Sequence, residues 1–208
     1  MLSMNWKGYR TAAWVGQALL AIAIAVVAIR GQWVAAASLA GFLFAAFLFV
    51  KFEDKLHLPT LFDLLFVIAA LINAGGWAWD LYNKPGPYDE IAHFYTMFAI
   101  TLAIGFIFYS ELMEGFSSHR VLFVLTIASL GIALGALWEV VEWLADFATP
   151  KQVVSGLTDT ITDIMLDSGG ALLAALLNVW GLHERSLVNE QARPPTATAS
   201  MAPPRKRA

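Results

Sequence analysis

The sequence contains no cysteine among its 208 residues. This absence excludes disulfides, thiolate metal sites and cysteine nucleophiles, so any metal would need oxygen and imidazole ligands. Charged residues are also scarce, at 14% of the chain, against roughly a quarter in soluble domains. The net charge of -3 provides no basic face for phosphate groups. We therefore expect no nucleic-acid partner.

Hydrophobic residues make up 59% of the chain and gather in six long segments. A helix that spans a bilayer needs about 20 largely apolar residues. The segments near this length are Thr11–Ile29, Trp33–Val50, Leu61–Trp79, Ile91–Tyr109, Val121–Leu144 and Thr162–Leu182. The sequence therefore predicts an all-α polytopic membrane protein, with a bundle of about six transmembrane helices in residues 1–183. Residues 184–208 are predicted to form a disordered cytoplasmic tail, because Pro, Ala, Thr and basic residues dominate its end.

The distribution of basic residues predicts the orientation in the membrane. Six spans put both termini on one side of the bilayer. Of the 13 Lys and Arg residues, only Arg30, Lys84 and Lys151 fall on the opposite side. The positive-inside rule therefore predicts cytoplasmic termini. The turns after the third and fifth predicted helices then face outward.

Acidic residues gather at the helix ends that this topology places outward. The fourth helix begins within YDEIAHF, which puts Asp89 and His93 one turn apart on one face. The fifth helix ends with WEVVEWLAD, where Glu139 and Glu142 share a face. Because the two helix ends meet at the same side of the membrane, we expect these side chains to lie close together.

The sixth helix begins with DTITDIMLDSGG, in which Asp159, Asp163 and Asp167 recur every four residues. The chain from Asp167 to Leu182 spans roughly 22 Å, less than the roughly 30 Å hydrocarbon core. Asp167 is therefore expected at lipid depth, where an Asp costs about 2.5–3.5 kcal/mol. Since His93 is the only basic side chain predicted nearby, we expect a bound metal ion or shared protons to neutralise the acids.

Each of these residues also has a purely structural interpretation. Asp89 is favourable near a helix N-terminus, and Asp159 is a preferred residue for capping one. Glu139 and Glu142 are also compatible with solvated charge at a helix end. We favour the functional interpretation because His93 is predicted to point into the bilayer beside these acids.

Three motifs together resemble a known group of proteins. YDEIAHF, WEVVEW and the Asp-rich run from Asp159 to Gly170 resemble the YjdF-type bacterial inner-membrane proteins and, more distantly, the VanZ-like group. The resemblance covers roughly residues 55–182. It implies a multi-pass protein of the bacterial inner membrane whose site faces the periplasm, but it implies no reaction. By position, its motif residues are Asp89, His93, Glu139, Glu142, Asp159 and Asp163.

Asp167 departs from that pattern, in which a small or amide residue is usual. The VanZ-like group is associated with resistance to glycopeptide antibiotics that act at the outer envelope. This association points to chemistry at the outer face of the membrane.

The first functional hypothesis is a membrane-embedded, metal-dependent enzyme that acts on an outer-leaflet lipid or a lipid-linked envelope substrate. Carboxylates with one imidazole suit Mg²⁺, Mn²⁺, Zn²⁺ or Fe²⁺. The predicted metal ligands are Asp89, His93, Glu139 and Asp163. Glu142 or Asp159 would act as a base or support the ligands. Arg30 is the only Arg predicted at the outer face, which argues against a phosphatase.

Two alternatives stay open at this stage. A proton- or cation-coupled transporter would also use buried carboxylates and a histidine, although the sixth helix is almost uniformly Leu and Ala between Asp167 and Asn178. A non-catalytic structural or regulatory membrane protein would present the acidic face to a partner or to divalent ions. The lipid bilayer is the expected surrounding, and the sequence does not indicate an oligomeric state.

Overall fold

The computed structural model of the protein describes residues 9–56, 60–116, 119–148, 154 and 156–192. The described residues form helices and no strand. In chain order the helices are α1 (Tyr9–Ile29), α2 (Trp33–Leu56), α3 (Thr60–Ala78), the 3-10 helix η2 (Leu81–Asn83), α4 (Tyr88–Phe116), α5 (Arg120–Ala148) and α6 (Leu157–Ala192). The predicted all-α class is confirmed.

Five of the described helices, α1, α3, α4, α5 and α6, are long and apolar enough to cross a membrane. The sixth, α2, has a shorter apolar part at Trp33–Leu48 and then continues to Leu56 through the charged sequence KFEDK. These lengths agree with a polytopic membrane bundle, as predicted.

The helix at the C-terminal end of the bundle is longer than the sequence predicted. It begins at Leu157 rather than Thr162 and continues to Ala192 rather than ending at Leu182. The sequence after Leu182 contains neither Gly nor Pro until Pro194, so nothing there disfavours helical backbone. The first residues of the predicted tail, from 184, therefore belong to α6, and residues 193–208 lie outside the described part.

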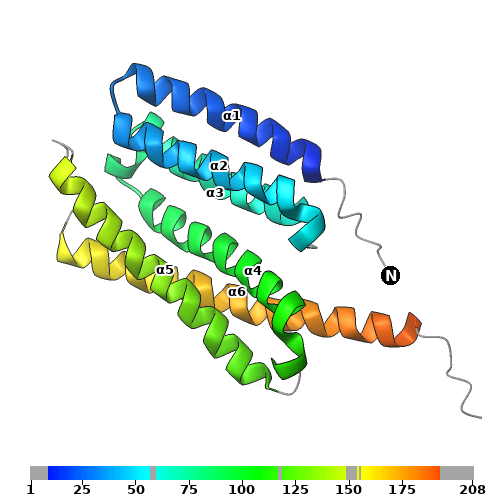
Figure 1. Ribbon diagram of the computed structural model, residues 1–208. Helices are drawn as coiled ribbons and strands as arrows, with labels where there is room; N and C mark the ends of the chain where they lie inside the picture. Colours follow the sequence, from blue (N-terminus) through cyan, green and yellow to red (C-terminus); the bar gives the residue numbers. More distant parts are fainter. Residues whose placement is uncertain (1–8, 57–59, 117–118, 149–153, 155, 193–208) are drawn as a thin grey trace, which may run out of the picture.

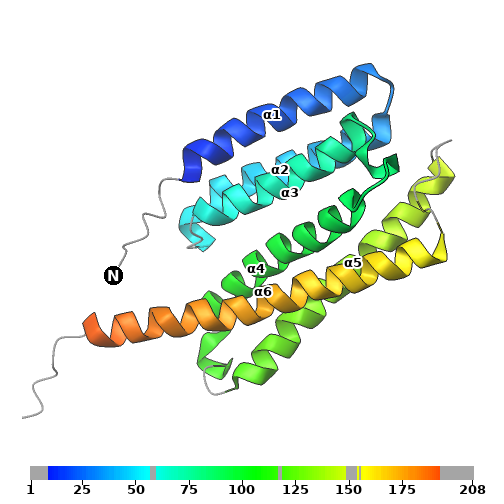
Figure 2. The same ribbon diagram turned by 180° about the vertical axis from the view of Figure 1, so that it is seen from behind.

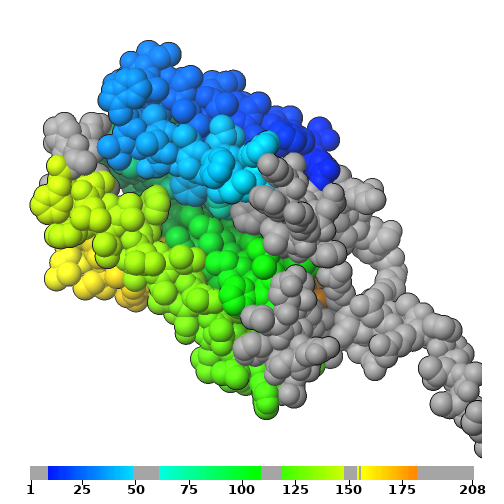
Figure 3. Space-filling view, in the orientation of Figure 1, coloured from blue at the N-terminus to red at the C-terminus, as the bar shows by residue number. Residues whose placement is uncertain are grey.

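The helices are arranged in two groups of three. Helices α1, α2 and α3 pack on one another, and α6 packs against both α4 and α5. Seen from the other side, α6 lies in front of α4 and α5 (Figure 2). Helices α3 and α4 are in contact and join the two groups. The space-filling view shows α1 and α2 in the upper part of the near face and α5 in the lower part, with α4 visible between α2 and α5 (Figure 3).

The ends of α1, α3 and α5 lie at one end of the bundle, whereas α1 begins and α6 ends at the opposite end (Figures 1 and 2). Arg30 in the first connection donates a hydrogen bond from Nη1 to the carbonyl oxygen of Ala78 at the end of α3. This contact ties the connection between α1 and α2 to the end of α3. The end of the bundle at which α1, α3 and α5 end is called the acidic end below, because the acidic residues of interest lie near it.

Small residues allow α6 to approach its neighbours closely. A methyl group added at Gly170 would lie 2.3 Å from the backbone oxygen of Phe94 in α4. A methyl group at Gly135 of α5 would lie 2.6 Å from Oδ2 of Asp167. Glycine at these two positions therefore brings α4, α5 and α6 close enough for their polar side chains to meet. Ala136, the residue after Gly135, is exposed.

Candidate functional site

The candidate site is centred on His93, which lies in the second turn of α4 with 6% of its surface exposed. Asp89 lies one turn earlier on the same face, as the spacing predicted. Its Oδ1 is 3.6 Å from Nε2 of His93. The side chain of Asp89 is 32% exposed, so this side of the imidazole ring faces the more accessible part of the site.

Carboxylates from α5 and α6 reach the other ring nitrogen. Oε1 of Glu139 lies 3.7 Å from Nδ1 of His93, and Oδ1 of Asp167 lies 3.3 Å from the same atom. The three side chains come from three helices that are distant in sequence. The predicted meeting of these helix ends therefore occurs in the structure.

The structure places the predicted residues in two overlapping groups that share His93. Asp89, His93 and Asp163 have ligand atoms within 4.8 Å of one another, and so do His93, Glu139 and Glu142. Five of the predicted residues are thus brought together. Asp159, which is half-buried one turn before Asp163, belongs to neither group. Asp167, which departs from the family pattern, lies nearer to His93 than Asp89 or Glu139 does.

Several carboxylate oxygens in the site are buried without a hydrogen bond. Among the described residues, these are Oε1 of Glu139 and both oxygens of Asp167. Burying an unpaired carboxylate is strongly unfavourable, because nothing replaces the lost hydration. Ligands bound to one Zn²⁺ ion lie about 2.0–2.2 Å from it, so neighbouring ligands are roughly 3–4 Å apart. The atoms of each group lie within 4.8 Å of one another, so small side-chain movements suffice to bring them around a cation. The unpaired oxygens of Glu139 and Asp167 need a cation, an N–H donor or a proton.

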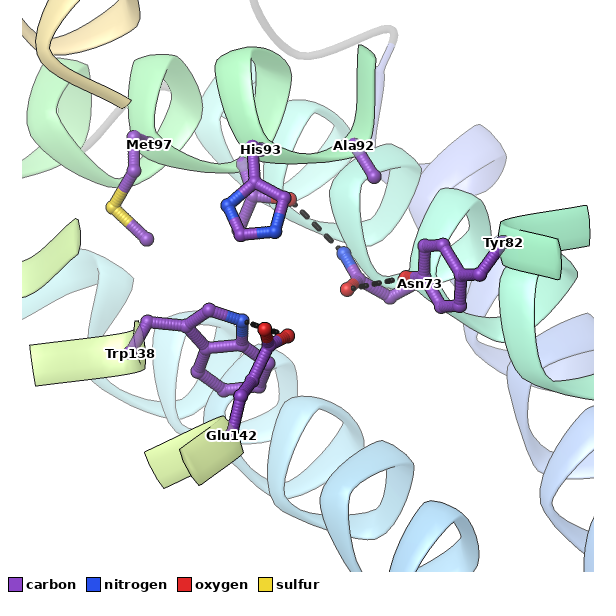
Figure 4. A pocket seen from close by; sticks show the side chains of 8 residues that line it. Asn73, Tyr82, Ala92, His93, Met97, Trp138 and Glu142 are labelled. Atoms are coloured by element: carbon purple, nitrogen blue, oxygen red, sulfur yellow. Dashed lines mark hydrogen bonds between the residues drawn. The ribbon is translucent and has the colours of Figure 1, made fainter. Parts of the chain in front are cut away.

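A small cavity lies beside His93, between the imidazole ring and Glu142 (Figure 4). Its walls also include Asn73 and Tyr82, and the free space suffices for about one water molecule. Nε1 of Trp138 donates a hydrogen bond of 2.8 Å to Oε1 of Glu142 and so holds this carboxylate in the cavity wall.

The two tryptophans that flank the glutamates differ in environment. Tryptophan is generally enriched at membrane–water interfaces. Trp143 is 55% exposed, which fits that position. Trp138 is half-buried and contacts the ring of Phe42 in α2. Trp138 therefore forms part of the wall of the site and does not lie at the lipid boundary.

A hydrogen-bond network behind the cavity was not predicted as part of the site. Nδ2 of Asn73 in α3 donates to Oγ1 of Thr96 in α4 and to the carbonyl oxygen of Ala69, each at 3.0 Å. The hydroxyl of Tyr82 donates to Oδ1 of Asn73, also at 3.0 Å. An Asn within a membrane span was a usable signal, because polar groups there need partners. Tyr82 carried no such signal, because it follows the span in a turn.

The environment of Tyr82 favours its protonated form. Burial raises the pKa of Tyr82 well above its ordinary value of 10.0, and the negative charges of Asp89 and Glu142 raise it further. The phenol therefore remains a hydrogen-bond donor at physiological pH. It packs edge-on against the ring of Tyr88, whose own hydroxyl donates to the carbonyl oxygen of Ile72.

Comparison with known proteins gives one match. Residues 11–184 match a family described as "Predicted membrane protein (DUF2238)". This is the family of the YjdF-type proteins, so that part of the sequence resemblance is confirmed, whereas the likeness to the VanZ-like group is not supported. No curated protein and no solved structure matches the chain.

Proposed function

The chain belongs to the DUF2238 family of predicted membrane proteins, and from this premise we propose that it is a metal-dependent enzyme of the bacterial inner membrane. Its substrate is an outer-leaflet lipid or a lipid-linked envelope precursor. The observation that carries the proposal is the convergence of carboxylates from α4, α5 and α6 on one buried histidine, with oxygens left unpaired.

In this proposal a divalent cation, Mg²⁺, Mn²⁺, Zn²⁺ or Fe²⁺, is held by Asp89, His93, Glu139 and Asp163. When bound, such an ion activates water or polarises a substrate oxygen. Glu142 lines the water-sized cavity beside His93 and is placed to accept a proton from a molecule in it. Asp159 supports the ligands from the start of α6.

The surroundings of the site favour a substrate that comes from the lipid. Ile91, Val140 and Met165 are large apolar residues on the same three helices, and each is at least half exposed. In a bilayer these side chains would contact acyl chains, while the 32% exposed Asp89 is available to a polar headgroup. Arg30 is the only Arg predicted at the outer face, and one of its N–H groups is donated to the carbonyl oxygen of Ala78, so a phosphate clamp of several basic side chains is not expected there. We therefore favour reactions that do not require one.

The orientation is part of the proposal. The basic residues place both termini in the cytoplasm, and the acidic end then faces the periplasm. This placement gives the site access to envelope precursors on the outer leaflet.

The proposal is tested by purifying the protein in detergent, stripping it with a chelator and reloading it separately with each of the four ions. Bound metal is measured by elemental mass spectrometry. We expect about one ion per chain in the parent protein. Both His93→Ala and Glu139→Ala should lower the affinity at least tenfold, because each removes a ligand.

His119→Ala is the matched control, since His119 is exposed at the opposite end of the bundle. It should bind metal as the parent does. A parent protein that takes up none of the four ions under any loading condition disproves the site. Metal binding without turnover of any lipid in a bacterial extract argues against the enzyme.

The alternative of proton- or cation-coupled transport is favoured by one observation. Two buried polar residues continue inward from the site along α4 and α6. Thr101 is fully buried, and its Oγ1 has no partner among the described residues; Asn178 is 4% exposed and donates to the carbonyl oxygen of Leu102. Ala171 and Ala175, both fully buried, lie between Asp167 and Asn178 in the sequence of α6. The helices would therefore have to move to open a path.

Ion flux into proteoliposomes separates this alternative from the enzyme. Flux that is lost in both Thr101→Val and His93→Ala would support transport. If neither turnover nor flux occurs in a protein that binds metal, the remaining candidate is a non-catalytic structural or regulatory role.

A further inference from the structure

Asp167 is the most enclosed carboxylate of the site. It is 1% exposed, and neither of its oxygens has a hydrogen-bond partner among the described residues. On one side it packs against Gly135, where any larger residue would collide with its side chain. On the other side its Oδ1 faces Nδ1 of His93 at 3.3 Å, just beyond the usual hydrogen-bond range. Asp167 is thus held in place and aimed at the imidazole ring.

A neutral imidazole limits what His93 can do. It has one lone pair that can bind a cation and one N–H that must be donated elsewhere. The two groups that share His93 therefore cannot both use it as a ligand. One ring nitrogen faces the cation, and the other faces a hydrogen-bond acceptor.

The surroundings of Nδ1 and Nε2 indicate which nitrogen faces the cation and which faces the hydrogen-bond acceptor. Nε2 faces Asp89, which is partly exposed and which forms a group with His93 and the buried Asp163. Nδ1 faces Asp167, which is completely enclosed and lacks a donor. An N–H on Nδ1 would satisfy this buried carboxylate. The free lone pair on Nε2 would then point to the side that an ion can reach.

Glu139 does not replace Asp167 as the acceptor. Its Oε1 lies farther from Nδ1, at 3.7 Å against 3.3 Å. Its longer side chain also leaves it able to turn toward the ion, whereas Asp167 is confined by Gly135. The shorter distance and the tighter confinement both favour Asp167.

We propose that Asp167 is a positioning residue that accepts the Nδ1–H of His93 and thereby presents Nε2 to the cation held with Asp89 and Asp163. This inference rests on the metal site proposed above. Carboxylate–histidine–metal arrangements of this kind fix the tautomer and the orientation of the ring and make it a better ligand. Asp167 itself does not contact the ion.

The first test measures the affinity of the full-length protein for Zn²⁺ and Mn²⁺ in detergent by calorimetric titration. Asp167→Ala should bind 10- to 100-fold more weakly than the parent, as is typical when such a partner is lost. Asp167→Asn keeps an acceptor oxygen of the same shape, so it should recover most of that loss. Ser168→Ala is the matched control, because Ser168 neighbours Asp167 but donates only to Ile164 of its own helix. It should bind as the parent does.

The second test needs no variant at position 167. Nitrogen NMR of ¹⁵N-histidine protein, assigned by comparison with His93→Gln, reports which ring nitrogen carries the proton. We expect the proton on Nδ1 and the Zn²⁺-dependent shift on Nε2.

The outcomes separate this inference from the proposed function. A parent protein that binds no metal disproves the metal site. A parent that binds metal, with Asp167→Ala binding equally well or with the ion on Nδ1, overturns the role of Asp167 and leaves the metal site standing. A general packing defect would weaken binding equally in Asp167→Ala and Asp167→Asn, and that result also counts against the inference.

Discussion

At the scale of single residues, some buried polar groups are hydrogen-bonded and others have no partner among the described residues. Asn73 has both ends of its amide satisfied, by Tyr82 on one side and by Thr96 and Ala69 on the other. Glu139 and Asp167 have buried oxygens with no such partner. Structural polar groups in membrane proteins are paired, because lipid offers no water to pair them. Buried oxygens without a partner also occur elsewhere among the described residues, at Asp63 and Thr101, but those of Glu139 and Asp167 lie beside His93. This convergence on His93 is what marks them as a candidate site.

The Tyr82 hydroxyl provides a residue-scale prediction. Tyr82→Phe removes the bond to Asn73 and should lower stability by about 0.6 kcal/mol, and at most about 1.7, the range measured for hydrogen bonds between membrane helices. Thermal unfolding in detergent measures the change. Tyr95→Phe is the control, because the described structure gives no hydrogen bond to the hydroxyl of Tyr95, and it should be neutral. Equal stability of both variants would show that the Tyr82 bond contributes nothing.

The bond between Trp138 and Glu142 provides a second prediction at this scale. Trp138→Phe keeps an aromatic ring beside Phe42 but removes the donor that holds Oε1 of Glu142. We expect the protein to remain folded, while turnover of its lipid substrate falls with little change in metal affinity. Elemental analysis and lipid mass spectrometry on the same preparation give the two values. If Trp138→Phe instead lost as much metal affinity as is expected for His93→Ala, Glu142 would be a metal ligand.

At the scale of secondary-structure elements, the crossing of α4 and α6 determines whether the site exists. The contact at Gly170 admits the backbone of Phe94, the residue next to His93, without an intervening side chain. Three residues before Gly170, α6 carries Asp167 toward the same part of α4. The roles of Gly170 and Asp167 are therefore linked, because the backbones of α4 and α6 must lie close together for the short Asp167 side chain to reach the imidazole ring of His93.

Substituting this glycine provides the element-scale prediction. In Gly170→Ala the added methyl group would lie 2.3 Å from the Phe94 oxygen, so the helices must separate. We expect a loss of about 1–3 kcal/mol, typical of overpacking, together with weaker metal binding. Thermal unfolding and metal titration measure the two effects.

Gly181→Ala is the matched control on the same helix, because a methyl group at Gly181 would meet nothing within 4 Å. Alanine favours helix over glycine by up to about 1 kcal/mol, so this variant should be as stable as the parent or more so. If Gly170→Ala behaves in the same way, the close crossing is not what positions the site.

At the scale of the whole molecule, the polar residues of the candidate site lie near one end of the bundle. The α1–α2 turn, η2 and the start of α4 lie there together, and Arg30 links the first of these to α3. The ends of α4 and α6 and the start of α1 lie at the other end (Figures 1 and 2). The proposed site at one end requires a defined orientation in the membrane, which the distribution of basic residues predicts.

The absence of cysteine makes the orientation testable. Lys84→Cys places a thiol at the acidic end, and His119→Cys places one at the opposite end; both positions are exposed. A membrane-impermeant maleimide added to intact spheroplasts should label position 84 and leave position 119 unlabelled until the membrane is permeabilised. The reverse pattern would place the site in the cytoplasm and rule out an outer-leaflet substrate.

The sequence by itself determined the class of the protein and the candidate residues. Apolar segments of membrane-spanning length define helices without reference to any contact, and the four-residue spacing puts Asp89 beside His93 or Asp163 beside Asp167 within one helix. These are local properties of the backbone. The orientation in the membrane is likewise predicted by counting Lys and Arg residues in the sequence. Helix ends were less predictable, as α6 shows, because polar helix formers continue a helix beyond the lipid.

Only the tertiary structure decided which side chains meet across helices. The rotation of α5 and α6 about their axes brings Glu139 and Asp167 to the same nitrogen of His93, while Asp159 stays outside both groups. The depth of Asp167 and the place of Tyr82 in the cavity wall also depend on it. Contacts between helices arise from packing of small residues over many turns, and no short motif encodes the resulting register.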